Sequence, residues 1–306
     1  MTRRIAHLLT VTVLLLAFSV PLAAQVSITP ESVGDVRALA EAGDAVSQLY
    51  LGMMSRRGVF MPLDHVAAMR WFRLAADQGQ IEAQFNLAAM YAYGEGTAQD
   101  WVSARRWYLL AANQGHATSM YSLGVIYDAG LGVSQDAEEA MRLYRLSADY
   151  GDAYAQTILG QKYADGDGVA HDWLTARRWF LLAANQGHTD AQVRLAIIYE
   201  NGFGGPQDHS EAVRLYRGAA AQRHAGAQMN LGLKYLKGEG VPQDEVTAHM
   251  WFNLAASEST GDLRDRAIEL RGSVESRLSA GQRAEAQRLA REWDEATPRP
   301  GIVIEP

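Results

Sequence analysis

Residues 104–116 read ARRWYLLAANQGH, and residues 176–188 read ARRWFLLAANQGH. The two segments differ at one position, Tyr108 against Phe180, and they begin 72 residues apart. When the chain is aligned against itself, the recurrence extends to six consecutive blocks of 36 residues: 43–78, 79–114, 115–150, 151–186, 187–222 and 223–258. A period of this length indicates a repeat architecture in which each block is one supersecondary unit. The two segments are therefore better explained as recurring scaffold than as two copies of a reactive site.

The first half of each block has the pattern of an amphipathic helix, which we call helix A. Each block has a leucine followed by Gly or Ala, and in five blocks a tyrosine stands four residues after the leucine, as in Leu87, Ala88 and Tyr91. These offsets place the side chains on one helical face. A Gly-x-Gly turn follows, as in Gly94 and Gly96, and we expect it to end the helix because glycine tolerates positive φ. The leucines are Leu51, Leu87, Leu123, Leu159, Leu195 and Leu231.

The second half of each block predicts another helix, helix B. An aspartate opens it in every block, and its carboxylate can accept hydrogen bonds from the free amides of the first turn. An alanine and an aromatic residue four positions later recur on one face, as in Ala104 and Tyr108. A hairpin of helices A and B cannot bury its apolar face alone, so we predict that stacked neighbours form a continuous core, an all-α solenoid. The opening residues are Asp64, Asp100, Asp136, Asp172, Asp208 and Asp244, and the aromatic residues are Phe72, Tyr108, Tyr144, Phe180, Tyr216 and Phe252.

The recurring pattern is Gly-x-x-x-Ala-Gln-x-x-Leu-Gly-x-x-Tyr-x-x-Gly-x-Gly-Val-x-x-Asp, followed by Ala-x-x-Trp-aromatic-x-x-Ala-Ala. It closely resembles the Sel-one-like repeat (SLR) family, which is related to the tetratricopeptide repeats, and the resemblance covers residues 43–258. It implies a right-handed α-solenoid whose helix A residues line a concave face, used mainly to hold other proteins together. The segment AEAQRLAREW, residues 284–293, resembles the tail of many exported bacterial SLR proteins.

The segments outside the repeats have different patterns. Residues 1–24 are expected to form a secretory signal peptide, because Arg3 and Arg4 precede an apolar stretch and small residues precede a cleavage point after Ala24. A retained membrane anchor is the alternative, but the apolar stretch is shorter than the roughly 20 residues that a span needs. We therefore expect a periplasmic or secreted protein with no membrane span after cleavage. The other expected segments are a linker and leading helix (25–42), two C-terminal capping helices (259–294) and a flexible tail (295–306).

The composition excludes several classes of function. The net charge is −7, and the 28 basic residues are 25 arginines and 3 lysines, with no basic block among them. Binding of nucleic acid needs a positive face, so we expect no nucleic-acid partner. The chain has no cysteine, which excludes disulfides and thiol chemistry.

Three features suggest chemistry but are better explained as scaffold. On a helical wheel, Arg106 and its equivalents fall opposite the core, where a solvated stripe is favoured over an anion-binding ridge. His116 and His188 are two repeats apart, so we expect no shared metal site. The loop 165–168 lacks the later acidic ligands of a calcium loop. We therefore predict no catalytic residue, no cofactor site and no metal site. The equivalent arginines are Arg70, Arg106, Arg142, Arg178 and Arg214.

The inner side of helix A is the candidate binding surface. Positions two before and two after the core leucine should point into the concave face. An apolar trough with aromatic residues suits an extended peptide or a partner helix, and packing of the same residues against neighbouring A helices is the alternative. The candidate partner-binding residues at these positions are Phe85, Tyr121, Val125, Gln161, Ile197, Met229 and Leu233, and Tyr93 flanks them at the end of its helix.

We therefore predict a non-catalytic scaffold or adaptor of the bacterial cell envelope that binds a protein or peptide and needs no cofactor. The alternative function is binding of peptidoglycan fragments or hydrolysis of β-lactams, because the resemblance includes exported SLR proteins linked to that chemistry. Those relatives resemble cysteine-rich chains. This chain has neither cysteine nor a Ser-x-x-Lys acylation motif.

Overall fold

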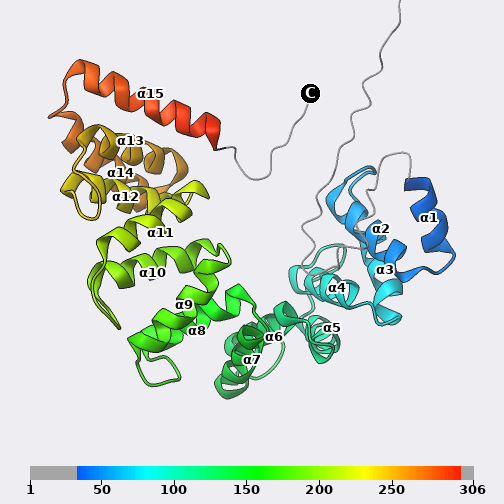
Figure 1. Ribbon diagram of the computed structural model, residues 1–306. Coiled ribbons are helices and arrows are strands. Elements are labelled where there is room, and N and C mark those ends of the chain that lie inside the picture. Colours follow the sequence, from blue (N-terminus) through cyan, green and yellow to red (C-terminus); the bar gives the residue numbers. More distant parts are fainter. Residues whose placement is uncertain (1–32, 298–306) are drawn as a thin grey trace, which may run out of the picture. The chain divides into compact units, whose positions relative to one another are not determined.

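The computed structural model describes residues 33–297 and contains, within them, fifteen α-helices and no β-strand (Figure 1). The predicted signal peptide, the linker before residue 33 and the predicted tail beyond residue 297 lie outside the described residues. The helices fall into two compact units that divide after Ala140, inside one helix, and each unit is described by itself. The predicted all-α solenoid of helix hairpins is confirmed.

The helices follow the predicted hairpin order. In the first unit they are α1 (Val33–Glu41), α2 (Ala45–Arg57), α3 (His65–Asp77), α4 (Ile81–Tyr93), α5 (Trp101–Asn113), α6 (Ala117–Ala129) and the start of α7 (Ala137–Asp149). The second unit continues α7 and adds α8 (Ala153–Asp165), α9 (Trp173–Asn185), α10 (Thr189–Asn201), α11 (His209–Ala221), α12 (Ala225–Lys237), α13 (Glu245–Glu258), α14 (Gly261–Glu275) and α15 (Ala280–Ala296). Helix A of the six repeats is α2, α4, α6, α8, α10 and α12, and helix B is α3, α5, α7, α9, α11 and α13.

Polar caps and glycines set the ends of these helices. Asp100 opens α5 by accepting the amides of Val102 and Ser103, each at 3.0 Å, and the aspartates that open the other B helices cap them in the same way. Gly94 ends α4 in the left-handed region, with φ of 71°. Both predicted signals are confirmed. The A helices have caps of their own, which are Asp44, Gln80, His116, Asp152, His188 and His224.

The core of each hairpin is an aromatic ring of helix B packed on a small residue of helix A. Phe180 of α9 is 1% exposed and lies so close to Gly160 of α8 that an added Cβ would stand 2.8 Å from the ring. The rings of Phe72 and Phe252 lie equally close to the corresponding glycines. A Cβ there would overpack the core, so these three repeats need glycine after the core leucine.

A ladder of glutamines joins consecutive repeats. Gln84 donates to the carbonyl of Ala76 at 3.2 Å, which belongs to the preceding hairpin, and accepts from Gln114 at 2.9 Å. The same pair of bonds recurs in three other repeats. In the sixth repeat a glutamate, Glu258, takes the place of Gln114. There Gln228 is fully buried, and its amide has no hydrogen-bond partner in the part of the chain that the structure describes.

Gln228→Met is expected to raise the free energy of unfolding by about 1 kcal/mol, because it removes a buried polar group without a partner. The chain already uses methionine at this position in the third repeat, where Met120 is buried. The matched control is Gln84→Met, which should cost about 1–2 kcal/mol because it strands the Ala76 carbonyl and the Gln114 amide. Denaturation in urea measures both variants. Destabilisation of equal size in the two would contradict the prediction.

Arg223 ties the C-terminal helix to the sixth repeat. It has φ of 63° at the position where the other five blocks have glycine, a conformation that costs a side-chain-bearing residue about 1 kcal/mol. Its guanidinium donates to Glu258 at 2.6 and 3.0 Å and also to Asp294. It lies 5.4 Å from the ring centroid of Trp293. These contacts offset the backbone cost and hold α15 against the last hairpin.

Candidate functional site

The predicted binding residues of the first unit lie on α4 and α6. Tyr93, at the end of α4, is 71% exposed. Phe85 is half-buried, with its ring centroid 4.9 Å from that of His116 and 5.8 Å from that of Tyr108. Tyr121 and Val125 of α6 are also half-buried. We call these four residues, Phe85, Tyr93, Tyr121 and Val125, the first-unit A surface. Only the Tyr93 side chain among them is exposed, and the other three side chains are half-buried.

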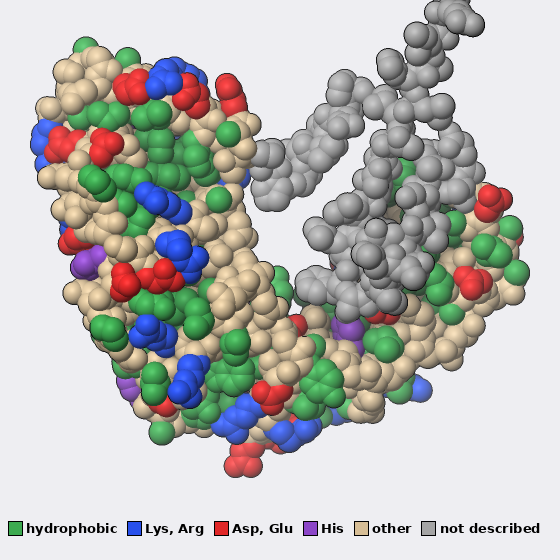
Figure 2. All heavy atoms as spheres, viewed as in Figure 1, with side chains coloured by type: hydrophobic (Ala, Val, Ile, Leu, Met, Phe, Trp, Pro, Cys, Tyr) green, Lys and Arg blue, Asp and Glu red, His purple; other side chains and the backbone are tan. Residues whose placement is uncertain are grey.

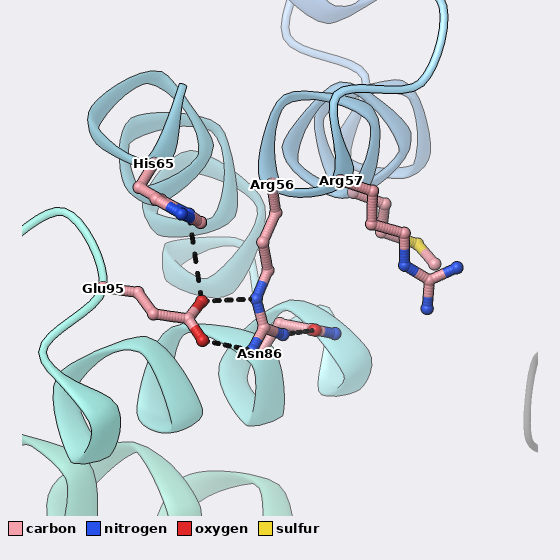
Figure 3. Close-up of a pocket in the computed structure, with 6 residues that line it drawn as sticks. Arg56, Arg57, His65, Asn86 and Glu95 are labelled. Atoms are coloured by element: carbon pink, nitrogen blue, oxygen red, sulfur yellow. Dashed lines mark hydrogen bonds and ion pairs between the residues drawn. The ribbon is translucent and has the colours of Figure 1, made fainter. Parts of the chain in front are cut away.

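A pocket of about 330 Å³ lies between α2, α3 and α4 of the same unit (Figure 3). It is adjacent in sequence to the first-unit A surface, since Asn86 follows Phe85 and Glu95 stands in the Gly-x-Gly turn after Tyr93. The lining side chains come from four segments that only the stacking of two hairpins brings together. They are Met53, Arg56, Arg57, His65, Asn86 and Glu95.

The two arginines of this pocket differ in their pairing. Arg56 donates to both carboxylate oxygens of Glu95, at 2.7 and 3.1 Å, and to the amide oxygen of Asn86 at 3.1 Å. This hydrogen bonding from Arg56 holds the pKa of Glu95 below its usual range. Arg57 has no hydrogen bond or ion pair with any described residue, and its side chain extends away from the Arg56–Glu95 pair (Figure 3). The Glu95 charge is therefore compensated, and Arg57 supplies a positive charge that no described residue compensates.

The predicted binding residues of the second unit differ from one another in exposure and packing. Ile197 of α10 is exposed, and Gln161 of α8 is half-buried and donates to Asp165. Met229 of α12 packs against a cluster of buried alanines from α13 and α14. Leu233 packs against the neighbouring cluster around Phe252. The capping helices thus cover part of the A-helix side in the sixth repeat, which leaves Gln161 and Ile197 as the more accessible candidates of this unit.

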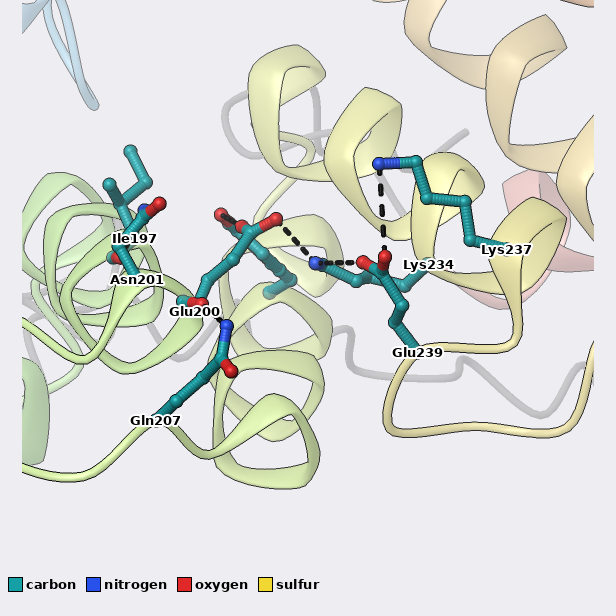
Figure 4. Close-up of polar contacts among 8 residues, drawn as sticks. Ile197, Glu200, Asn201, Gln207, Lys234, Lys237 and Glu239 are labelled. Carbon is teal, nitrogen blue, oxygen red and sulfur yellow. Dashed lines mark hydrogen bonds and ion pairs between the residues drawn. The ribbon is translucent and has the colours of Figure 1, made fainter.

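A buried lysine joins the fifth and sixth repeats (Figure 4). The Lys234 side chain is 2% exposed and donates to Glu200 and, at 2.8 Å, to Glu239. Tyr216 donates to the other oxygen of Glu200 at 2.9 Å. Burial, with the nearby Glu200 charge, raises the pKa of Tyr216, and the Lys234 hydrogen bond lowers the pKa of Glu239. Lys234, Glu200, Glu239 and Tyr216 are hydrogen-bonded to one another, so we assign this network to packing between repeats.

Sequence reasoning missed both the pocket and this network. For Lys234 a signal exists, because four other repeats have Met or Ile at the same position, and a lysine in a buried register needs an acidic partner. For the pocket no such signal exists. Arg56 and Glu95 are 39 residues apart in sequence, and their positions in the repeat are polar in some blocks and apolar in others.

The histidines considered above have a structural role. His116, His188 and His224 each cap a helix A, with Nδ1 facing the amide three residues later at 3.2, 3.4 and 3.0 Å. Nδ1 can accept this bond only when the imidazole is neutral. Within residues 33–297 no three His, Cys, Asp or Glu side chains are grouped as a metal site would require. In the calcium-like loop, Asp165 accepts from Gln161 and Asp167 from Lys162.

Acidification is expected to weaken the fifth repeat through His188. Burial lowers the pKa of His188, against the opposing effect of Asp190 and Asp152. The unfolded chain therefore binds more protons than the folded chain, so stability is lost as pH falls below about 6.5. The midpoint of thermal unfolding should drop less between pH 7.5 and 5 in His188→Asn, because asparagine caps a helix without titrating. Burial also lowers the pKa of His249, so the stability of the variant should still depend on pH to a smaller extent. An identical pH profile for the two proteins would contradict the prediction.

Comparison with known proteins identifies the family of the repeats. Six consecutive stretches match the Sel1 repeat, beginning two residues after the blocks defined from the sequence: 45–80, 81–116, 117–152, 153–188, 189–224 and 225–259. Among proteins with curated descriptions, none is similar enough to count as a match. In the described part of the chain, no helix combines the length and apolar character needed to cross a membrane.

Solved structures with this architecture support the match. A Sel1 repeat protein from Oxalobacter formigenes is 27% identical, with a TM-score of 0.68 over 76% of this chain and 100% of that chain. A protective antigen present in uropathogenic Escherichia coli strains, which displays an SLR fold, is 28% identical, with a TM-score of 0.53 over 88% of this chain. The match spans 64% of the antigen's length. Because the repeat matches run without a gap from residue 45 to residue 259, the chain belongs to the Sel1 repeat family.

Proposed function

We propose that this protein is a non-catalytic scaffold of the bacterial cell envelope that binds a protein or peptide on its A helices. Sel1 repeat proteins generally mediate interactions between proteins, and such scaffolds are typically not enzymes. The signal-peptide pattern of residues 1–24 supports a periplasmic or secreted location. The fold alone does not define the ligand; the first-unit A surface and the pocket next to it in sequence supply the specific features.

The observation that carries the proposal is the Arg57 guanidinium, which no described residue compensates, in the same unit as the exposed ring of Tyr93. Arg57 pairs with no described residue, and a guanidinium is suited to bind a carboxylate through two parallel hydrogen bonds. Tyr93 supplies a large exposed ring at the end of α4. A peptide with an acidic residue next to an apolar one would fill both features, with the carboxylate on Arg57 and the apolar side chain against Tyr93.

Site-specific crosslinking from the native envelope tests this proposal. Tyr93→Ala and Arg57→Glu change side chains with little or no packing role, so both variants should fold normally. We expect each to lower partner capture at least tenfold. The control is Tyr150→Ala, which removes a tyrosine of similar exposure, 60%, that follows helix α7 rather than a helix A. Undiminished capture by both Tyr93→Ala and Arg57→Glu would overturn the assignment of this surface.

The non-catalytic part of the proposal has a separate test. Incubation with muropeptides and with a chromogenic β-lactam should give neither turnover nor a shift in the melting temperature. Turnover of either compound would favour the alternative of a cell-wall enzyme. A melting-temperature shift without turnover would favour a binder of peptidoglycan fragments.

A further inference from the structure

The outer sides of α3 and α5 carry a repeated row of exposed residues. Each row has an aliphatic residue, an arginine and a leucine at intervals of four, which places the three side chains along one line of the helix. The four aliphatic side chains are between 39% and 57% exposed, and both arginines are exposed. We call this set the outer patch, and it consists of Val66, Arg70 and Leu74 of α3 with Val102, Arg106 and Leu110 of α5.

The two rows belong to neighbouring helices of the first unit. Arg73 of α3 places its guanidinium carbon 5.0 Å from the ring centroid of Trp107 of α5. The residues of one row stand at the same repeat positions as those of the other, 36 residues later. The contact makes α3 and α5 neighbours at this point, and the equivalent positions put both rows on the outer side of the B helices rather than on the A helices of the proposed partner site.

The charges of the outer patch are unbalanced. On the face seen in Figure 2, some basic side chains lie beside acidic ones and others lie among hydrophobic ones. Arg70 and Arg106 form no hydrogen bond or ion pair with any residue in 33–297. The nearest acid in sequence on α3, Asp77, is paired with Arg73 at 3.1 Å, and α5 contains no acidic residue. Two unpaired guanidinium groups thus stand among four exposed aliphatic side chains.

The same arginine position looks different in the fifth repeat. Arg214 of α11 is held by both carboxylate oxygens of Glu211, at 2.8 and 2.6 Å. Its neighbours one turn away on either side are Ser210 and Gly218. The outward arginine therefore occurs in five of the six B helices, while the lack of a paired carboxylate and the aliphatic neighbours one turn away are specific to certain repeats. This difference supplies a matched control within the same chain.

We infer that the outer patch docks on the surface of an anionic phospholipid bilayer. A guanidinium binds phosphate oxygens through paired hydrogen bonds and is weakly hydrated, so it enters the headgroup region readily. Aliphatic side chains one turn to either side can then bury in the interface. A bilayer presents phosphates at every lateral position, whereas an acidic protein would have to place two carboxylates in register with Arg70 and Arg106.

The net charge of the first unit favours contact through its few uncompensated basic groups. Residues 33–140 contain twelve acidic and seven basic residues, so the unit as a whole is repelled by an anionic surface. The outer patch gains from the approach because it combines two arginines, which pair with no described residue, with four exposed aliphatic side chains. The expected binding is therefore peripheral, sensitive to salt and directed through α3 and α5.

The absence of cysteine in the chain allows a position-specific test. Leu110→Cys, labelled with an environment-sensitive fluorophore in the full chain, is mixed with vesicles containing phosphatidylglycerol or phosphatidylcholine alone. We expect a blue shift of emission with the anionic vesicles. Gly218→Cys, the same position in the fifth repeat, should show no shift. Because the probe reports its own surroundings, binding through residues 1–32 does not mimic the result.

Charge variants complete the test. Combining Arg70→Gln with Arg106→Gln should weaken anionic-vesicle binding, measured with the Leu110→Cys probe, by about 30-fold, since each basic side chain contributes about a fivefold effect near such a surface. Arg214→Gln should leave the binding unchanged. The inference is overturned by the absence of a blue shift from the Leu110→Cys probe, by equal binding to neutral vesicles, or by full binding of the double variant. Capture of an acidic protein through Arg70 and Arg106 without vesicle binding also overturns it.

Discussion

Phe180→Ala is expected to lower the free energy of unfolding of the central repeats by about 3–5 kcal/mol. The ring is 1% exposed and belongs to the core cluster that joins α9 to α10 and α11. It also covers Gly160, which has no side chain to fill the space that the ring would leave. The surrounding helices are held by their own neighbours, so the cavity should persist rather than collapse.

Leu182→Ala on the same helix is the matched control. Leu182 is 47% exposed, and its truncation should change stability by less than about 0.5 kcal/mol. Hydrogen exchange is the preferred measurement, because a repeat array need not unfold in one step. Loss of protection in Phe180→Ala should concentrate in α8 to α10. Equal losses in the two variants, or a loss confined to distant helices, would contradict the role assigned to the ring.

Lys234→Met is expected to destabilise the last two repeats by about 2–3 kcal/mol. Methionine fits the register, since Met54 and Met90 occupy the same repeat position, so the loss comes from the charges that remain. Removing one partner of a buried ion pair costs about 3–5 kcal/mol. The expected value is smaller here because Glu200 and Glu239 are 29% and 34% exposed and retain part of their hydration.

Lys162→Met provides the comparison for this variant. Lys162 stands at the same position in the fourth repeat and pairs with Asp167 at 2.8 Å, but the Asp167 side chain is 69% exposed. Water can therefore solvate that carboxylate after the substitution, and we expect a loss below about 1 kcal/mol. Urea denaturation followed by tyrosine and tryptophan fluorescence distinguishes the two. A loss in Lys162→Met as large as that in Lys234→Met would show that burial of Lys234 is not the cause.

Much of the fold follows from the sequence because each repeat contacts mainly its neighbours. The period of 36 residues, the small residue after the core leucine and the aspartate before helix B predict the hairpins and their caps, and the structure confirms each of these. The histidine caps were not predicted, although the position is polar in every block. Imidazole is an uncommon capping group, and its use depends on the ring orientation that neighbouring side chains impose, such as Phe85 against His116.

The candidate site was less predictable for a physical reason. Side chains at a helix position two before or two after the core leucine lie at the border between neighbouring helices, where small differences in packing decide their exposure. Thus Thr157 is buried, Phe85 is half-buried and Ile197 is exposed. The same holds for charge, since the sequence shows that Arg56, Arg57 and Glu95 exist but does not show which arginine Glu95 pairs with.

The sequence by itself determined the class of architecture, the number of repeats and the identity of the core, because these depend on periodic patterns within one hairpin. The tertiary structure decided which charged groups are compensated and which are free, because that depends on contacts between hairpins 30 or more residues apart. Arg56 and Arg57 are adjacent in the chain, yet one is bound to Glu95 and the other is unpaired among the described residues.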